Sequence, residues 1–158
     1  LENFSGTARR MEVVGKCNGA LIIDDYAHHP TEIRTTLQGI REMYEKENII
    51  CLFHPHTFTR TKGFFDGFVR SFADVEELII LDIYGSAREE QGGVHSTDIV
   101  KAIKKNNEEA GVVQKVDYIP TLIEAEEYLR KKIGRGDLVI LMGAGDVFRV
   151  GENLVSDK

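Results

Sequence analysis

Histidines and carboxylates follow directly on two apolar segments of the chain, and such side chains suit acid–base, metal or ligand chemistry. The stretch DDYAHHPTEI (residues 24–33) follows the apolar run 20–23, and HPHTFTRTK (residues 54–62) follows the apolar run 49–53. Four of the five histidines lie in these two stretches. A metal centre, a catalytic site, a nucleotide contact and a capped helix start are all open interpretations of this pattern.

The clustered histidines do not have the spacing of a zinc site. Structural zinc is typically held by closed patterns such as CxxC or HxxxH, and adjacent histidines on an extended loop point apart. We therefore expect no metal ligand here. His29 and His54 are as well explained by capping or packing as by ligand contact, whereas for His28 and His56 we favour contact with a substrate.

An arginine and a glycine-rich turn could bind an anion. Arg60 lies at the start of a predicted helix, where the helix dipole disfavours a positive charge. Its position indicates either that it binds an anionic ligand or that it is an exposed arginine without a partner. The turn GAGD (residues 143–146) could bind carboxylate or phosphate through its backbone N–H groups, or could be only a tight turn. Arg88–Glu90 is expected to be a solvated tip of the long irregular segment 84–96. No P-loop of the form GxxxxGK(S/T) is present to hold the phosphates of ATP.

An alternation of short apolar runs and helical patterns must position these side chains. Predicted strands lie at 20–24, 49–53, 78–83, 112–119 and 138–142, with an extra edge strand at 11–14. Apolar stripes predict helices over 33–44, 64–72, 99–103 and 122–133, and a short helix after Gly145. This predicts an α/β fold: a doubly wound, mostly parallel Rossmann-like sheet of about six strands with helices on both faces. Ligands bind such a sheet beyond the carboxyl ends of its strands.

Residues with known preferences for helix ends predict where these helices begin and stop. Pro30 suits a first helical turn, and Ser96 or Thr97 is the expected N-cap of the third helix. Thr121–Glu124 fits a capping box, and Gly134 is the expected left-handed stop of the same helix.

The composition is that of one globular domain. The chain has 158 residues, of which 42% are apolar and 29% charged. Its net charge of −6 argues against a nucleic-acid surface, and no apolar run reaches the ~18 residues of a membrane span. Cys17 and Cys51 are expected to be reduced core thiols of a cytoplasmic protein. The chain opens on Leu1 without an initiator methionine, so we expect an excised fragment.

Several motifs together resemble those of the Mur ligases. Besides DDYAHHPTEI, the stretch HPHTFTRTK is similar to that family's F-Q-P-H-x-(Y/F)-T-R-T pattern, and FSGTARRMEVVG is similar to its F-x-G-x-x-R-R junction between central and C-terminal domains. GSAREEQGG and GAGDV are also similar to family stretches, and the resemblance runs from Phe4 to about Leu154. It implies that residues 1–10 are a remnant of an inter-domain linker and residues 11–158 the C-terminal domain, which contacts ATP and the amino acid. The N-terminal and central ATPase domains would be absent from this chain.

The resemblance implies an ATP-dependent ligase of peptidoglycan synthesis. ATP would phosphorylate the carboxylate of UDP-N-acetylmuramate, and the amine of L-alanine would attack the resulting acyl phosphate. ATP and Mg²⁺ would be held mainly by the central domain, which is the expected partner of this one. The isolated chain would be inactive. Two alternatives stay open: a recycling ligase that attaches a tripeptide to UDP-N-acetylmuramate, and a non-catalytic nucleotide-binding module.

The resemblance also implies roles for single residues at matching positions. Asp25 would hydrogen-bond the ATP ribose, and Tyr26 and His28 would line the cleft for the amino acid and the substrate. His56 and Arg60 would lie near the acyl phosphate and the alanine carboxylate, and with His28 they form the expected catalytic group. Besides Tyr26, His28 and Arg60, the expected substrate-binding residues are those of the glycine-rich turn: Gly143, Gly145 and Asp146.

Two positions depart from the family pattern. His54 replaces a glutamine of many relatives, and Thr57 replaces an arginine. The second change leaves Arg60 as the lone expected anion contact of its loop. Asp24 and His29 have no implied role, and we expect both to be structural.

Overall fold

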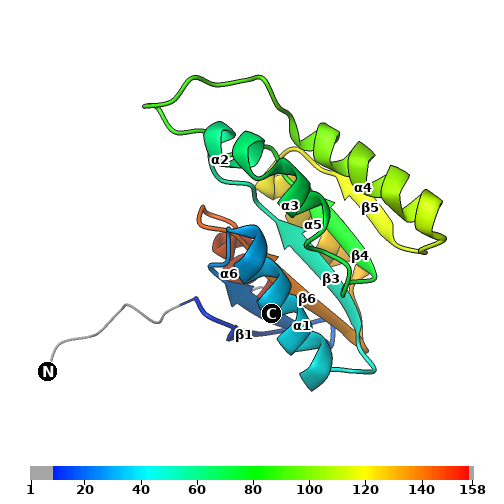
Figure 1. Ribbon diagram of the computed structural model, residues 1–158. Coiled ribbons are helices and arrows are strands. Elements are labelled where there is room, and N and C mark those ends of the chain that lie inside the picture. The colour runs from blue at the N-terminus through cyan, green and yellow to red at the C-terminus, as the bar shows by residue number, and fades with distance from the viewer. Residues whose placement is uncertain (1–8, 157–158) are drawn as a thin grey trace, which may run out of the picture.

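The computed structural model describes residues 9–156, which form a six-stranded sheet flanked by helices (Figure 1). The strands are β1 (Glu12–Cys17), β2 (Ala20–Asp25), β3 (Asn48–Phe53), β4 (Glu77–Ile80), β5 (Lys115–Tyr118) and β6 (Asp137–Met142). The helices are α1 (Pro30–Met43), α2 (Phe58–Gly63), α3 (Phe65–Val69), α4 (Ser96–Ala110), α5 (Leu122–Lys132) and α6 (Phe148–Ser156). The predicted α/β class is confirmed.

The strand order decides which loops can meet. It is β1-β2-β6-β3-β4-β5, with β1 antiparallel to β2 and every other pair parallel. The last strand in the sequence, β6, therefore lies between β2 and β3. As a result the GAGD turn that follows β6 emerges between the two histidine-containing loops.

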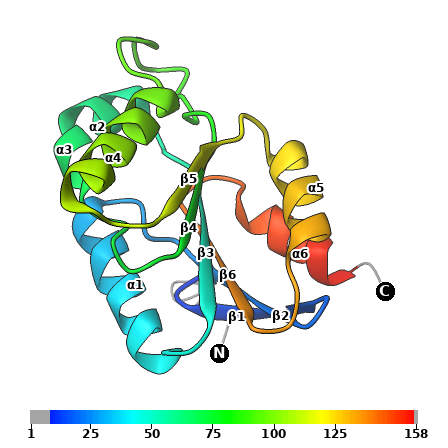
Figure 2. The same ribbon diagram turned by 90° about the vertical axis from the view of Figure 1, so that its right-hand side faces the viewer.

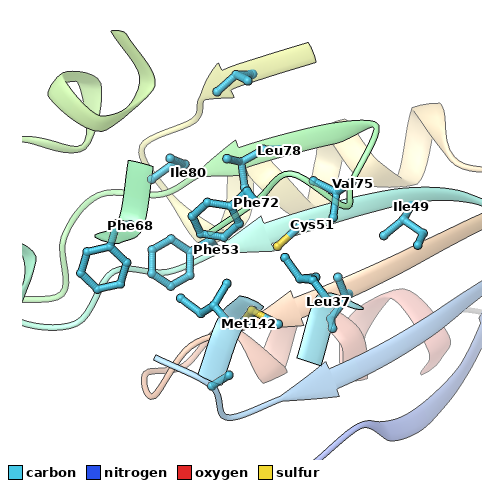
Figure 3. Close-up of a cluster of buried hydrophobic side chains, with 14 of the residues drawn as sticks. Leu37, Ile49, Cys51, Phe53, Phe68, Phe72, Val75, Leu78, Ile80 and Met142 are labelled. Carbon is cyan, nitrogen blue, oxygen red and sulfur yellow. The ribbon is translucent and has the colours of Figure 1, made fainter. Parts of the chain in front are cut away.

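Helices cover both faces of the sheet, as predicted. Figure 2 shows α1, α2, α3 and α4 on one face and α5 and α6 on the other. Strands buried in this way are apolar on both sides, which explains their nearly continuous apolar sequences. Phe53, Phe68 and Phe72 pack together in one core cluster (Figure 3). The ring centroid of Phe53 lies 5.6 Å from that of Phe68 and 5.1 Å from that of Phe72. Both cysteines are buried core residues.

The predicted helix over 64–72 is wrong as a single element. Helix α2 begins earlier, at Phe58, and Phe64 separates it from α3 with a non-helical backbone (φ −115°, ψ 24°). The apolar stripe still identified the buried face, because Phe68 and Phe72 are core residues. It could not show the break, which lies beside Gly63, a residue with low helix propensity.

Histidines, rather than hydroxyl residues, cap two helices. The His29 side chain accepts from Thr31 N (3.2 Å) at the start of α1, which confirms its expected structural role. The His95 side chain caps α4 in the same way, so the expectation of Ser96 or Thr97 was wrong. Ser96 is instead the first residue of the helix, and its buried hydroxyl donates to Leu81 O.

Other helix and strand ends differ more modestly. Thr121 caps α5 by accepting from Glu124 N (3.2 Å), but its hydroxyl donates to the Glu124 carboxylate, so only half of the capping box forms. Gly134 is not a left-handed stop, because α5 ends at an extended Ile133 (φ −73°, ψ 149°). Strand β5 starts only at Lys115, later than predicted, since the chain leaves α4 through a left-handed glycine.

Candidate functional site

Three loops meet at the carboxyl edge of the central strands. Gly143 N donates to Asp25 O (3.2 Å), which joins the GAGD turn to the DDYAHHP loop after β2. His54 N donates to Met142 O (2.9 Å), which joins β6 to the loop after β3. The polar residues that follow the three strands are thus brought to one edge of the sheet.

Asp25 lies in the wall of a cavity beside this edge. Its carboxylate is buried, and its two oxygens accept from Met11 N and Ala27 N, each at 2.8 Å. Each carboxylate oxygen has a second lone pair, so it can accept a further bond. The cavity has a volume of about 390 Å³, and its wall consists of Arg10, Met11, Asp25, Tyr26, Ala27, Thr31, Glu32, Thr35 and Thr36.

Arg10 is a cavity residue that motif reading did not single out. The junction motif that contains Arg10 gives no signal for this role, because only the fold brings Arg10 and Asp25 into the wall of one cavity. Arg10 forms no hydrogen bond or ion pair within residues 9–156. It can therefore contribute a positive charge to the wall of the Asp25 cavity.

His28 is held in one tautomer by the backbone. Its Nδ1 lies 3.0 Å from Tyr26 O, and because a carbonyl only accepts, Nδ1 carries the hydrogen. The Nε2 lone pair of a neutral His28 is then left for a ligand or a proton. The Tyr26 ring packs edge-on against His28 with centroids 5.2 Å apart, and it is 45% exposed, so it can also contact a ligand.

His56 and Arg60 form a coupled pair at the start of α2. Arg60 Nη1 donates to His56 Nδ1 (3.2 Å), so His56 is neutral and its hydrogen is on Nε2. Burial lowers the pKa of His56, and the charges of Arg60 and His28 lower it further, against an opposing effect of Glu89. The His56 ring stacks on Tyr84 at 5.5 Å.

Arg60 keeps its capacity to bind an anion. Within the described residues it forms no ion pair with a carboxylate, and its one side-chain hydrogen bond goes to neutral His56. A guanidinium in this state can form a forked pair with a carboxylate or phosphate. Arg60 and His56 are not in the wall of the Asp25 cavity, so the edge has two separate polar regions.

Close packing against His54 explains why positions 143 and 145 of the GAGD turn are glycines. A Cβ on Gly143 would lie 2.7 Å from His54 O, and one on Gly145 would lie 3.2 Å from His54 Nδ1. His54 Nδ1 itself is buried and has no hydrogen-bond partner among residues 9–156. Burial is the main reason that the pKa of His54 falls to about 4. The two glycines thus have a packing reason, and their predicted contact with substrate stays a prediction.

The orientation of the GAGD turn is set by Arg9, another residue that motif reading missed. Its guanidinium donates to Gly143 O (2.9 Å) and Gly145 O (3.2 Å). It also forms an ion pair with buried Asp24 at 2.7 Å, which confirms a structural role for that carboxylate. The carbonyls of the turn therefore face Arg9, while the N–H groups of Ala144 and Gly145 have no acceptor in the described part of the chain.

Asp146 closes the turn at the surface. Its carboxylate is half-exposed and lies 3.7 Å from Arg149 Nε on α6. The pairing is weak enough, in solvent, that Asp146 could still contact an amine. Among residues 9–156, no group of three or more His, Cys, Asp or Glu side chains is placed to hold a metal ion. No helix of the described chain is long and apolar enough to cross a membrane.

Comparison with known proteins gives one consistent family. The family model described as Mur ligase, glutamate ligase domain, matches residues 9–145. The UDP-N-acetylmuramate–L-alanine ligase of Desulfosudis oleivorans is 38% identical over 158 residues, covering all of this chain and 34% of that protein. The chain therefore spans about a third of the length of the curated relatives that it matches.

Solved structures show the same fold. The UDP-N-acetylmuramate–alanine ligase of Thermotoga maritima superposes with a TM-score of 0.72 at 22% identity, over 93% of this chain and 29% of that one. A murein peptide ligase of Psychrobacter arcticus gives 0.74 at 21% identity, over 94% and 29%. Fold, site motifs and the family match over most of the described residues agree, and the chain belongs to the Mur ligase family.

Proposed function

We propose that this chain is the C-terminal domain of an ATP-dependent ligase that joins L-alanine to UDP-N-acetylmuramate through an acyl phosphate. The observation that carries the proposal is the identity of about 40% over essentially the whole chain with relatives named UDP-N-acetylmuramate–L-alanine ligase. In this proposal residues 1–10 belong to the inter-domain linker, of which residues 1–8 lie outside the described structure. The catalytic domains that hold Mg²⁺ and most of ATP belong to the rest of a longer protein acting in the cytoplasm.

The Asp25 cavity is the proposed contact for the nucleotide. Asp25 has spare lone pairs for ribose hydroxyl groups, and Arg10 adds a positive charge to the same wall. Bound ATP would supply the phosphoryl group that activates the carboxylate. The role of this domain is then to orient one end of the nucleotide, which supports catalysis by positioning rather than by covalent chemistry.

The second polar region is the proposed contact for the amino acid and the developing phosphate charge. Arg60 can bind a carboxylate or phosphate oxygen, and neutral His56 can donate from Nε2 to an oxygen beside it. The N–H groups of Ala144 and Gly145, which have no acceptor among residues 9–156, are further donors at the same edge of the sheet. Donors fixed before the reaction stabilise negative charge as it develops. When neutral, His28 presents the lone pair of Nε2, and it is the side chain suited to accept a proton from the attacking amine.

The recycling ligase is the second candidate, because the murein peptide ligase structure superposes as well as the alanine ligase does. Fold similarity at this level does not separate the two functions. We favour alanine because the curated relatives cited above have that name. Competition between L-alanine and tripeptide for the complete protein decides between them: preferential consumption of tripeptide would reverse our assignment.

Arg60→Ala in the complete protein tests the proposed site. Loss of a charge-assisted hydrogen bond of about 1.5–3 kcal/mol predicts a fall in kcat/KM for L-alanine of roughly 10- to 100-fold. Arg34→Ala is the matched control, since Arg34 is exposed on α1. An unchanged kcat/KM in Arg60→Ala would remove this arginine from the site.

A further inference from the structure

The loop between β4 and α4 contains the carboxylate of Glu89, which is not in the wall of the Asp25 cavity. Arg88 and Glu90 are exposed, as expected for a solvated tip, but Glu89 is only partly exposed and its carboxylate is bound. Its Oε1 accepts from Phe58 N (2.9 Å) and Ser86 N (2.9 Å), and its Oε2 accepts from Thr59 N (3.0 Å) and the Thr59 hydroxyl (2.9 Å). One side chain thus ties the loop to the first turn of α2.

Thr57, the residue just before this turn, has a strained backbone conformation. Thr57 has φ 65° and ψ 139°, a conformation that a β-branched residue rarely adopts. Such strain persists only where the surrounding structure fixes it. Thr57 N donates to Tyr84 O (2.8 Å), and its hydroxyl accepts from Arg60 N (3.2 Å). The two amides between Thr57 and Arg60 are those that bind Glu89.

Glu89 therefore fixes the backbone between the two side chains of the proposed anion region. His56 precedes Thr57 and Arg60 follows Thr59, so both project from the segment that Glu89 holds. Its carboxylate stays ionised over a wide range, because N–H donors of Ser86, Thr59 and Phe58 lower its pKa to about 2. It does not form an ion pair with Arg60, which keeps that guanidinium available.

We propose that Glu89 is a positioning residue, whose carboxylate fixes the strained turn so that His56 and Arg60 present a preformed contact to an anionic ligand. The ligand part of this inference rests on the proposed function. The structural part, the hold on the segment from His56 to Arg60, does not. The two parts can therefore be tested separately.

The structural part is tested by NMR on the 158-residue chain. Glu89→Ala and Glu89→Gln are compared with Glu90→Gln, a change at the exposed neighbouring carboxylate. We expect amide hydrogen exchange at Phe58 and Thr59 to accelerate at least about tenfold in Glu89→Ala, and less in Glu89→Gln, which keeps one acceptor oxygen. Core amides of β3 should be unaffected. The ring ¹⁵N signal of His56 Nδ1 should move as its bond from Arg60 is lost.

Unchanged exchange at Phe58 and Thr59, or an unchanged His56 signal in both Glu89 variants, would overturn the structural part. In the complete ligase we expect Glu89→Ala to lower kcat/KM for L-alanine about tenfold, with Glu90→Gln unchanged. Altered NMR signals with normal kcat/KM would refute the positioning role. Absence of ligase activity in the unmodified protein would instead refute the proposed function and leave the NMR result standing.

Discussion

Removing Arg9 should destabilise the chain more than removing the charge of its partner Asp24. Arg9 donates to both Asp24 oxygens (2.7 and 3.3 Å) and to two carbonyls of the GAGD turn. Its side chain is 18% exposed and that of Asp24 4%. Breaking a buried pair costs about 3–5 kcal/mol, because a buried charge is left alone, and partial exposure of Arg9 reduces this to about 3 kcal/mol for Arg9→Met.

Asp24→Asn should cost only about 1 kcal/mol, since an amide oxygen can still accept from Arg9 and the two carbonyl bonds remain. Burial raises the pKa of Asp24 despite the bond from Arg9, so its ionised form is already disfavoured in the folded chain. A raised pKa contributes stability that is present at low pH and is lost as pH rises through that pKa. The cost of Arg9→Met should accordingly shrink as the solution is acidified and Asp24 takes up a proton.

Urea unfolding of the 158-residue chain at pH 7 measures these differences. In the Asp24→Asn background, Arg9→Met should cost only about 1.5 kcal/mol, for the bonds to the two carbonyls and to the amide that replaces the carboxylate, which gives a coupling energy of about 1.5 kcal/mol. Arg10→Met is the control, because Arg10 has no polar partner within the described residues, and it should cost less than about 0.5 kcal/mol. Equal effects of Arg9→Met and Arg10→Met, or a larger effect of Asp24→Asn than of Arg9→Met, would refute this reasoning.

Two further predictions concern the second loop. Thr57→Gly should be more stable than Thr57→Ala by about 1–2 kcal/mol, since both lose the hydroxyl cap but glycine tolerates the positive φ of 65°; equal urea midpoints would contradict this. Burial lowers the pKa of His54 from 6.5 in the unfolded chain to about 4 in the folded chain. Between these two pH values the unfolded chain binds a proton that the folded chain does not, so stability falls as the pH drops from about 6.5 to about 4. His54→Gln should remove up to about 3 kcal/mol of this acid sensitivity, and parallel pH profiles for the two proteins would rule the explanation out.

Local sequence patterns predicted the elements well, because each pattern reports the burial of one face. The strands at 20–24, 49–53 and 138–142 are β2, β3 and β6 with boundaries shifted by a residue at most. Periodicity could not predict strand order. The position of β6 between β2 and β3 depends on pairing between segments far apart in the chain. That order is what brings the GAGD turn between the two histidine loops.

The residues that support the site were the least predictable. Arg9 and Glu89 act through backbone groups of distant loops, and such contacts leave no spacing signature. Both were visible only as charged residues in a junction and a surface loop. His95 was not predicted as a helix cap because serine is preferred at that position, but Ser96 is the first residue of α4 and the cap falls one residue earlier.

Phosphate release from ATP by the complete protein that contains this chain tests the central proposal most directly. We predict release that requires both UDP-N-acetylmuramate and L-alanine, with one UDP-N-acetylmuramoyl-L-alanine formed per phosphate, and no release from the isolated 158-residue chain. Activity that does not depend on L-alanine, or alanine-dependent release by the isolated chain, would contradict the proposal.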